Sequence, residues 1–430
     1  MDGECARMKQ IRRRLAWIAA FVLLVLTAGC GPATPEKITL TLATFGQFGY
    51  EDLIPGYEFT HPGLTVRQVR TEQGGPYHQD LLAKLQNGGE LADIQAVEEG
   101  HLADVLAQAG KFTDLAKVGP ADVRPGRWLE WKYEAGRSKD GKLVGYGTDI
   151  GPLAMCYRKD LLEAAGLPTD PGSVKTMFAT WDSYFQAGER YVKRSKGKAW
   201  FDSAAQNFNA MVNQLPVGYL NRDDRSTLET NTALRDAWNQ VTTAVKQGQS
   251  AGLTAFADDG NNGLRVGAFA TKVCPSWMLG VIEQQAGLGN AGKWAITDAF
   301  PNGGGNWGGS YLTVPASSPH AKEAAALAAW LTAPEQQLHA FRVSGNFPSQ
   351  VDAFTSPDLL SEMNGYFGGA LSGQVFVAQA QKVGKPQYKG PGDGKIQETV
   401  IAPALKSVEQ GADPAAVWEQ VLIGVRRVVP

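Results

Sequence analysis

The chain has 430 residues, of which 43% are hydrophobic and 20% charged, with 41 basic against 43 acidic side chains. This composition is that of a globular protein with room for two or three domains, and it disfavours disordered, collagen-like and multi-span membrane proteins. A net charge of -2 provides no basic face for phosphates, so nucleic acid is not an expected partner. The 50 Gly, 23 Pro and 11 Trp predict many turns and a surplus of large flat side chains.

The first thirty residues have the organisation of an export signal. A basic stretch at 12–14 precedes an uncharged apolar run at 15–26, and Thr27, Ala28 and Gly29 bring small residues up to Cys30. The apolar run is short for a membrane span and fits a secretory signal. Small residues directly before a cysteine resemble the lipobox of bacterial lipoproteins, which predicts cleavage after residue 29 and a lipid on Cys30. The alternative is a plain secreted protein in which Cys30 is incidental.

Two cysteines, Cys156 and Cys274, remain beyond the signal region. In an oxidising compartment a pair of cysteines favours a disulfide over a metal site, and the sequence has no Cys-x-x-Cys or paired-histidine spacing for zinc. Two independent buried thiols are the alternative. No metal and no other cofactor is expected.

After the signal, the sequence pattern predicts strands and helices in alternation. Apolar and polar residues alternate over 38–45, which is typical of a half-buried strand. The elements expected next are a helix over 52–59, a strand over 64–69, a helix ending near 87–89 and a strand over 93–97. Such alternation predicts an α/β fold with a parallel sheet. Ligands bind at the carboxyl ends of such strands, so the loops at 45–50 and 98–101 hold the first candidate site residues.

A second α/β region is expected further along the chain. The predicted helices cover 159–165, 181–193, 207–214 and 232–247, and the predicted strands cover 199–201 and 272–277. Two more helices are expected at 321–331 and 415–425. The last of them should begin with Asp413 as its N-cap and Pro414 in its first turn.

Two glycine-rich segments match nucleotide-binding patterns in their letters alone. Residues 303–308 fit the dinucleotide fingerprint, but that motif needs a strand before it and a helix after it, and here a strand at 310–314 follows. Residues 287–293 have P-loop spacing, with Trp294 where a hydroxyl should bind magnesium. Hydrolase motifs such as Gly-x-Ser-x-Gly are absent from the sequence. A glycoside hydrolase that uses Glu98 or Asp149 is the enzyme alternative.

Several short motifs, in order along the chain after the signal, resemble the extracellular solute-binding proteins of ABC importers. They are 44–46, 57–63, 156–161, 180–182, 308–312 and 330–335, together with the lipobox at Cys30. Within that family the chain looks most like the oligosaccharide-binding group, and specifically the cello-oligosaccharide-binding lipoproteins. Residues 149–156, 274–280 and 303–309 carry that finer resemblance.

The resemblance implies a periplasmic-binding-protein-like fold, in which two α/β lobes are joined by crossing strands and close like a hinge. It divides the chain into a signal peptide (1–29), a tether (30–37), an N-terminal lobe (38–148 plus 299–343) and a C-terminal lobe (149–298 plus 344–430). The crossings are expected near 147–151, 297–301 and 343–347. Cys156 and Cys274 would both lie on strands of the C-terminal lobe, close to the hinge, which favours a disulfide between them.

A sugar presents CH-rich ring faces and a rim of hydroxyl groups, so its site needs flat rings and polar side chains. Trp277 and Trp307 are the strongest stacking candidates, because each follows Gly or Pro positions outside the helical stripes. The other candidate ligand-binding residues are Asp149, Asp202, Glu98, Gln47, Phe48, Tyr50, Asn306 and Asn346. The alternatives are packing for the rings, and a cap, a hinge hydrogen bond or a solvated position for the polar groups.

These expectations combine into a monomeric receptor, lipid-anchored on the outer face of the cell membrane through Cys30. It would bind an oligosaccharide, first of all a cello-oligosaccharide, and deliver it to the transmembrane subunits of an ABC permease without catalysis of its own. A glycoside hydrolase and a binding protein for another β-linked oligosaccharide are the alternatives.

Overall fold

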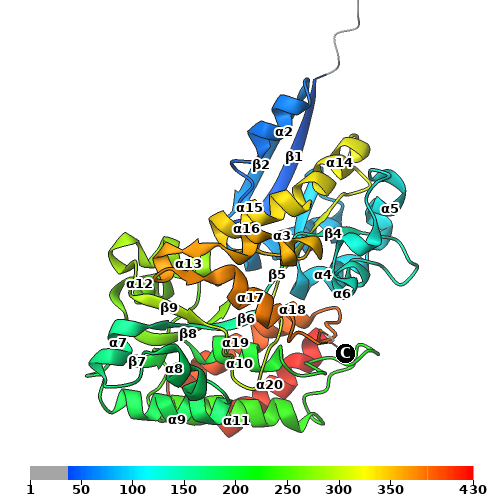
Figure 1. Ribbon diagram of the computed structural model, residues 1–430. Coiled ribbons are helices and arrows are strands. Elements are labelled where there is room, and N and C mark those ends of the chain that lie inside the picture. Colours follow the sequence, from blue (N-terminus) through cyan, green and yellow to red (C-terminus); the bar gives the residue numbers. More distant parts are fainter. Residues whose placement is uncertain (1–36, 385, 430) are drawn as a thin grey trace, which may run out of the picture.

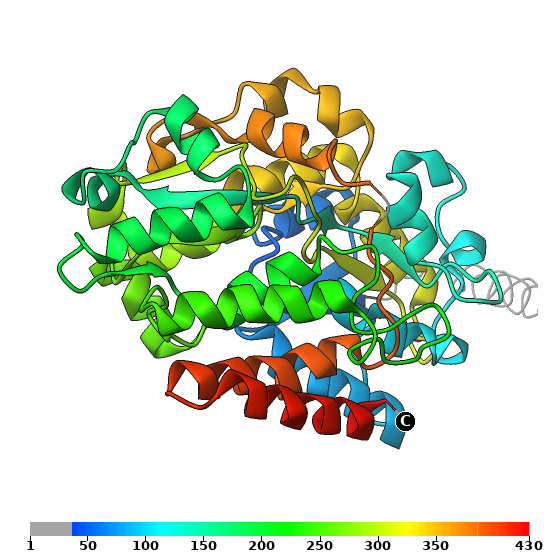
Figure 2. The same ribbon diagram turned by 90° about the horizontal axis from the view of Figure 1, so that it is seen from below.

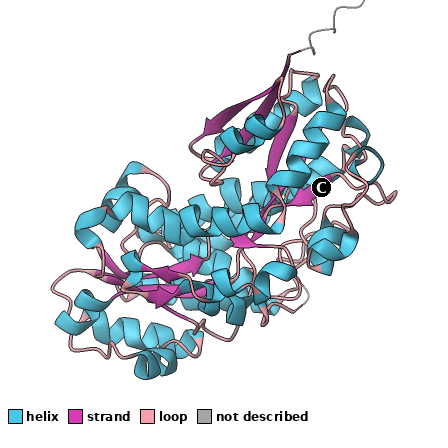
Figure 3. Ribbon diagram, turned by 45° about the horizontal axis from the view of Figure 1, so that its top comes forward, coloured by secondary structure: helices cyan, strands magenta, loops and turns pink. Residues whose placement is uncertain are grey.

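The computed structural model describes residues 37–384 and 386–429. The expected signal peptide, Cys30 and nearly all of the expected tether therefore lie outside the described residues. The strands form two separate groups, each surrounded by helices (Figure 3). We call the part built on the five-stranded sheet the first lobe and the part built on the four-stranded sheet the second lobe. Within the described residues, every helix is too short or too polar to cross a bilayer.

The first-lobe sheet has the strand order β2-β1-β3-β10-β4. Its strands are β1 (Ile38–Phe45), β2 (Leu64–Thr71), β3 (Ile94–Glu98), β4 (Gly145–Gly147) and β10 (Ser310–Thr313). β2, β1 and β3 are parallel as expected, but β10 is antiparallel to both β3 and β4. The parallel arrangement expected for the strands of the 38–97 region is confirmed, whereas β10 enters from the other lobe, at the edge where β3 ends, and runs in the opposite direction.

Helices cover both faces of the first-lobe sheet (Figure 1). Leu42 and Ile94 pack on one face with Leu327, whereas Val97 packs on the other with Leu81 and Leu85. This alternation follows from the two-residue period of a strand. The helices of the lobe are α2 (Ile54–Thr60), α3 (Gly74–Asn87), α4 (Glu99–Leu106), α5 (Leu115–Val118), α6 (Glu130–Ala135), α14 (Ala321–Leu331) and α15 (Pro334–Ser344).

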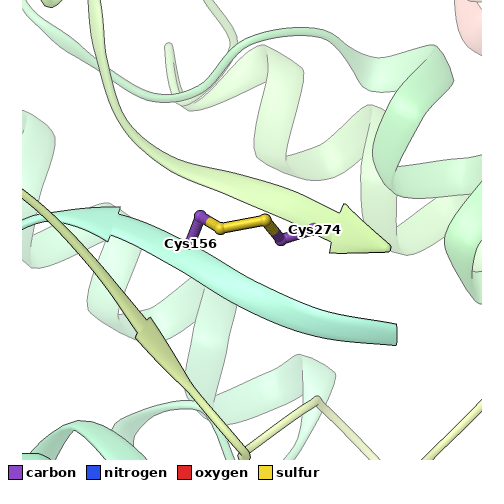
Figure 4. The surroundings of a disulfide bond; sticks show 2 residues. All are labelled: Cys156 and Cys274. Atoms are coloured by element: carbon purple, nitrogen blue, oxygen red, sulfur yellow. A yellow bond between two sulfur atoms is a disulfide. The ribbon is translucent and has the colours of Figure 1, made fainter. Parts of the chain in front are cut away.

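The second-lobe sheet has the order β7-β8-β6-β9 and is mostly antiparallel. Its strands are β6 (Leu153–Arg158), β7 (Ala199–Phe201), β8 (Phe269–Pro275) and β9 (Trp294–Thr297), with only β7 and β8 parallel among them. Cys156 on β6 and Cys274 on β8 form a disulfide with a Cα–Cα distance of 5.5 Å (Figure 4). The disulfide joins two neighbouring strands that are 118 residues apart in sequence.

The second lobe carries most of the helices. They are α7 (Lys159–Ala164), α8 (Pro171–Met177), α9 (Trp181–Val192), α10 (Ala204–Val212), α11 (Thr232–Lys246), α12 (Asp258–Val266), α13 (Met278–Ala286), α16 (Pro357–Leu360), α17 (Ser372–Ala380), α18 (Asp393–Ile396), α19 (Ala402–Glu409) and α20 (Pro414–Val428). The C-terminal helices α19 and α20 pack beside α11 (Figure 2). Asp413 caps α20 as expected, since its carboxylate accepts a hydrogen bond from the Ala416 N–H at 3.0 Å.

The chain crosses between the sheets at three places. Two crossings pair with each other, because β5 (Asp149–Ile150) and β11 (Phe347–Pro348) form an antiparallel pair. The remaining crossing, which is the second in chain order, lies later than the expected 297–301, since the Gln214 side-chain amide donates to the carbonyls of Pro301 and Gly303 and keeps them with the second lobe. The chain therefore crosses at about 305–309. The expected lobe limits otherwise stay predictions.

Candidate binding site between the lobes

Trp277 and Trp307 meet between the two lobes. Trp277 follows β8 and begins α13, and Trp307 lies on the crossing that leads into β10. Their ring centroids are 5.9 Å apart with perpendicular planes, and the Trp277 indole N–H donates to the Trp307 carbonyl at 3.0 Å. Both side chains are half-buried, so each ring keeps part of its surface exposed. Phe256, with its centroid 6.1 Å from that of Trp277, adds a third ring that the sequence analysis missed.

Glycines allow the two crossings to approach these rings. Gly308 has φ +82°, and a Cβ there would lie 3.2 Å from the Trp277 indole nitrogen and 3.5 Å from Glu98 Oε1. A Cβ on Gly151 would lie only 1.8 Å from the Trp307 carbonyl oxygen. The glycine-rich 303–308 segment therefore serves close backbone packing and a left-handed conformation, not phosphate binding. The same geometry brings the Glu98 carboxylate close to Trp277.

Two carboxylates lie at the carboxyl end of β3, as the strand order leads one to expect. Glu98 caps α4 by accepting from the Gly100 N–H at 2.6 Å through Oε2. Glu99 accepts from the Asn306 side-chain amide at 2.7 Å. Burial raises the pKa of Glu99, and the ammonium groups of Lys389 and Lys132 oppose that shift. Both acidic side chains therefore face the second crossing, one beside Trp277 and one bonded to Asn306.

Asp149 forms a hinge hydrogen bond through one of its carboxylate oxygens. Its Oδ1 accepts from the Ser310 N–H at 2.8 Å and from the Thr148 hydroxyl at 2.5 Å, which ties β5 to the start of β10. Burial raises the pKa of Asp149, with the ammonium of Lys132 acting in the opposite direction. Asp149 Oδ1 is thus occupied by the hinge hydrogen bonds that the sequence analysis gave as the alternative to ligand binding. A contact between Asp149 and a ligand stays a proposal.

The two candidate asparagines hold backbone segments together. Asn306 accepts from the Gly151 N–H at 2.9 Å, and its amide group donates to Glu99 and to the Gly308 carbonyl. Asn346 donates to the Gln47 carbonyl at 2.8 Å and to the Ser344 hydroxyl at 3.2 Å. Since each amide has two N–H donors, neither has a free donor for a ligand in this arrangement. Gln47 itself is half-buried, and its backbone is fixed by Asn346.

The expectation for Phe48 and Tyr50 is corrected by the structure. Both rings belong to the first-lobe core, with exposed fractions of 5% and 2%. Gly49 has φ +72°, and a Cβ there would lie 2.7 Å from the side chain of Val343 on α15. The loop after β1 is therefore pressed against α15 and turns its aromatic rings inward.

Asp202 forms an ion pair inside the second lobe. It pairs with the ammonium of Lys272, and both side chains are 4% exposed. A buried carboxylate held by a buried ammonium is a structural pair whose disruption is costly. Asp202 also lines a small cavity together with Phe256, and a contact between Asp202 and a ligand stays a proposal.

Charged groups missed by the sequence analysis complete the site. Lys132 on α6 is fully buried. Asp393 is the first residue of α18, and Lys389 lies in the segment directly before that helix. Burial raises the pKa of Asp393 to about 7, and the carboxylates of Glu99, Glu98 and Asp104 add to that shift. Burial would lower the pKa of Lys389, but the carboxylates of Glu99, Glu98 and Asp393 raise it overall. The glycine- and proline-rich 390–394 stretch was the available sequence signal for this segment.

Side chains also join the lobes away from the crossings. His101 Nε2 lies 3.1 Å from Glu398 Oε1, and Asp104 accepts from the Gly392 N–H at 3.0 Å. These contacts place α18 beside α4 (Figure 1). The Gln73 amide donates to the Phe256 carbonyl at 3.4 Å. The two lobes are therefore in contact with each other around the site.

This combination of groups has a definite chemistry. Flat rings can cover apolar ring faces, carboxylates accept from hydroxyl groups, and ammonium groups donate to oxygen. No cluster of three or more His, Cys, Asp or Glu fit for a metal occurs in the described part of the chain. Two α/β lobes that meet over such a site define a hinged binding protein of the class that closes around a small molecule.

Comparison with known proteins places the chain in a family of that class. It matches the family described as bacterial extracellular solute-binding protein over residues 53–363, and it belongs to that family. The arabinooligosaccharide-binding protein of Bacillus subtilis (strain 168) is 26% identical over an alignment 382 positions long, which covers 81% of this chain and 82% of that protein.

Two further proteins match over nearly the whole chain. An uncharacterised lipoprotein of Streptomyces antibioticus is 26% identical over an alignment 431 positions long, which covers 93% of this chain and 89% of that protein. A crystal structure of a family 1 extracellular solute-binding protein has a TM-score of 0.80 and 45% identity, and covers 91% of this chain and 99% of its own. The two-lobe fold is therefore that of the extracellular solute-binding proteins.

Proposed function

We propose that this protein is the substrate-binding component of an ABC importer and that it captures an oligosaccharide between its two lobes. The observation that carries the proposal is the perpendicular pair of Trp277 and Trp307 beside the Glu98 carboxylate. One sugar ring can stack on a flat indole face while its hydroxyl groups donate to the carboxylates. A relative whose name states that it binds arabino-oligosaccharides supports the same ligand class.

The proposed ligand is a cello-oligosaccharide, and another β-linked oligosaccharide is the alternative. The test is a calorimetric panel on the mature protein with cello-, chito-, manno-, malto- and arabino-oligosaccharides. Tightest binding of a cello-oligosaccharide is expected. Tighter binding of a different series would replace the ligand but keep the receptor, whereas the absence of binding to every series would contradict the receptor itself.

Binding without catalysis is the second part of the proposal. Incubation with cellotriose should change tryptophan fluorescence in a saturable way, because Trp277 and Trp307 are half-buried and would become covered. The sugar should be recovered intact. Turnover of cellotriose would instead support a glycoside hydrolase, and substitutions Glu98→Gln and Asp149→Asn would then identify its carboxylates.

The proposed location is the outer face of the cell membrane, with a lipid on Cys30 and delivery to the transmembrane subunits of a permease. The lipobox-like residues before Cys30 and a relative described as a lipoprotein support this part. Mass spectrometry of the N-terminal peptide should find an acylated Cys30. The Cys30→Ala variant should no longer fractionate with membranes, and an unmodified Cys30 would contradict the anchor.

A further inference from the structure

Lys132 is a fully buried lysine at the junction of the two lobes. Its backbone is fixed, because its N–H donates to the Leu129 carbonyl at 2.9 Å and its own carbonyl accepts from the Tyr311 hydroxyl at 3.2 Å. Its side chain passes the end of β4, where a Cβ on Gly147 would lie 2.8 Å from Lys132 Cγ. It ends at the second crossing, where a Cβ on Gly309 would lie 3.0 Å from Lys132 Nζ. Two glycines thus make room for this one side chain.

The ammonium of Lys132 lacks a hydrogen-bond acceptor among the described residues. It lies 3.8 Å from the centroid of the Tyr311 ring, which stabilises a cation only in part. Lysine is almost never fully buried without a partner, because removing an ammonium group from water is costly. The Lys132 ammonium therefore carries hydrogen-bond donors that no described residue accepts.

The surroundings of this ammonium are those of the interlobe site. The carboxylates of Asp149, Glu99 and Glu98 stabilise its positive charge, whereas the ammonium of Lys389 repels it. Gly309, which lies against the ammonium, is the neighbour of Gly308, which lies against Trp277 and Glu98. The ammonium and the aromatic pair are thus at adjacent residues of the same crossing.

We propose that Lys132 is a ligand-binding residue whose ammonium donates hydrogen bonds to the hydroxyl or ring oxygens of the bound sugar. The inference rests on the proposed function and adds a specificity-determining residue to it. The carboxylates around Lys132 accept from sugar hydroxyl groups, so donor and acceptor chemistry are both present. Because carboxylates outnumber ammonium groups there, the site favours a neutral sugar over one with a carboxylate of its own.

The proposal has a signature in the pH dependence of binding. Burial lowers the pKa of Lys132 to about 8, with Asp149, Glu99 and Glu98 opposing the shift. Among the groups that face it, burial raises the pKa of Tyr311 and the nearby carboxylates raise the pKa of Lys389, so both lose their protons at higher pH than Lys132. Burial also raises the pKa values of the Glu99 and Asp149 carboxylates, and the Lys132 ammonium opposes both shifts. The charged donor is therefore lost as the pH rises through about 8, and sugar affinity should fall.

The experiment is calorimetry with the tightest-binding oligosaccharide at about pH 7.5 and about pH 9.5, on wild type, Lys132→Met and Lys117→Met. Lys117 is the matched control, an exposed lysine on α5. Wild type and Lys117→Met should bind at least about fivefold more weakly at the higher pH. Lys132→Met should bind about tenfold more weakly than wild type at the lower pH and show no such dependence.

The outcomes separate this inference from the proposed function. A wild-type affinity that does not change with pH would overturn the role of Lys132, and this measurement needs no variant to fold. A Lys132→Met protein that is less stable but binds sugar like wild type would also overturn it, by leaving a purely structural role. If wild type binds no oligosaccharide at all, the proposed function fails first.

Discussion

The two lobes contribute different chemistry to the site between them. The first lobe supplies charge, with Glu98 and Glu99 at the end of β3 and Lys132 on α6. The second lobe supplies flat surface, with Trp277 after β8 and Phe256 next to it, and it adds the charged Lys389 and Asp393 at and before the start of α18. A sugar has an apolar face and a polar rim, so a ligand between the lobes would contact each with a different part of its surface. Closure would then depend on both kinds of contact.

The two sides of the site also differ in what fixes their position. We call Trp277, Trp307 and Phe256 the aromatic wall, and we call Glu98, Glu99, Asp149 and Lys132 the charged wall. The aromatic wall follows directly from β8, which is cross-linked to β6 through Cys274 and Cys156. The charged wall is held by hydrogen bonds to the crossings, such as Asn306 to Glu99 and Ser310 to Asp149. The second lobe should therefore be the more dependent on oxidation, and the first lobe the more dependent on pH.

Removal of the disulfide should have the largest effect on this contrast. A cross-link between residues 118 apart restricts a long loop of the unfolded chain, so the Cys156→Ala/Cys274→Ala variant should lose about 3 kcal/mol of unfolding free energy. Calorimetric melting of the mature protein should show it, and reductant should affect wild type only. Titration of the unreduced, unfolded mature protein should find no free thiol from this pair. Two titratable thiols would contradict the disulfide.

Removal of the aromatic wall should come next. Trp277→Ala deletes a half-buried ring, and we expect a loss of about 2 kcal/mol in binding, or roughly thirty-fold in Kd. Trp307→Ala should have a similar effect, because the two rings are in contact. Isothermal titration with the tightest-binding oligosaccharide measures both.

The matched control for the tryptophan variants is Trp330→Ala. Trp330 is also half-buried, but it packs against Tyr57 in the first lobe, with ring centroids 5.0 Å apart. This variant should lower the melting temperature and keep the sugar affinity of wild type. If Trp277→Ala and Trp307→Ala both keep that affinity as well, the site lies elsewhere.

The sequence predicted the aromatic wall better than the charged one. Trp277 and Trp307 could be singled out because Gly and Pro positions separate them from the helical stripes, whereas Trp238 and Trp181 on such stripes are buried in the core. Lys132 could not be found this way, because its burial depends on Gly147 and Gly309, which come close to it only in the fold. Long-range packing of this kind leaves no local pattern.

The sequence pattern also failed to predict the orientation of side chains and of one strand. The strand over 38–45 was correctly predicted, but the left-handed turn at Gly49 reverses the loop after it and buries Phe48 and Tyr50. The strand over 310–314 was expected too, yet its antiparallel orientation follows from its entry out of the second lobe. Local residue patterns predict elements, whereas side-chain orientation at their ends depends on what packs against them.

Neutralising Asp393, the second-lobe carboxylate that interacts with Glu98 and Glu99, should have a smaller, pH-dependent effect. The folded-state pKa of Asp393, about 7, is above its unfolded value, so the folded protein binds the extra proton and stability falls as the pH rises from about 4 to about 7. Asp393→Asn removes this cost, and at about pH 8 it should be more stable than wild type by at least about 1 kcal/mol. At about pH 4 the two should melt alike. The control is Asp236→Asn at an exposed position on α11, and equal melting of Asp393→Asn and wild type at every pH would contradict the buried charge.

The contact between His101 and Glu398 should have the smallest effect, because a partly exposed ion pair contributes about 0–1 kcal/mol. Burial would lower the pKa of His101, but the hydrogen bond to Glu398 and the nearby carboxylates of Glu98 and Asp104 raise it overall. A raised histidine pKa stabilises the contact at low pH, and the contribution is lost as the pH rises through the folded-state pKa. Without sugar, wild type should therefore be more compact in small-angle scattering at about pH 6 than at about pH 8. Glu398→Gln should lose that difference, while Glu189→Gln, which breaks the ion pair with Lys193 at the C-terminal end of α9, should keep it. A wild type with equal dimensions at both pH values would contradict control of the lobe contact by the pair of His101 and Glu398.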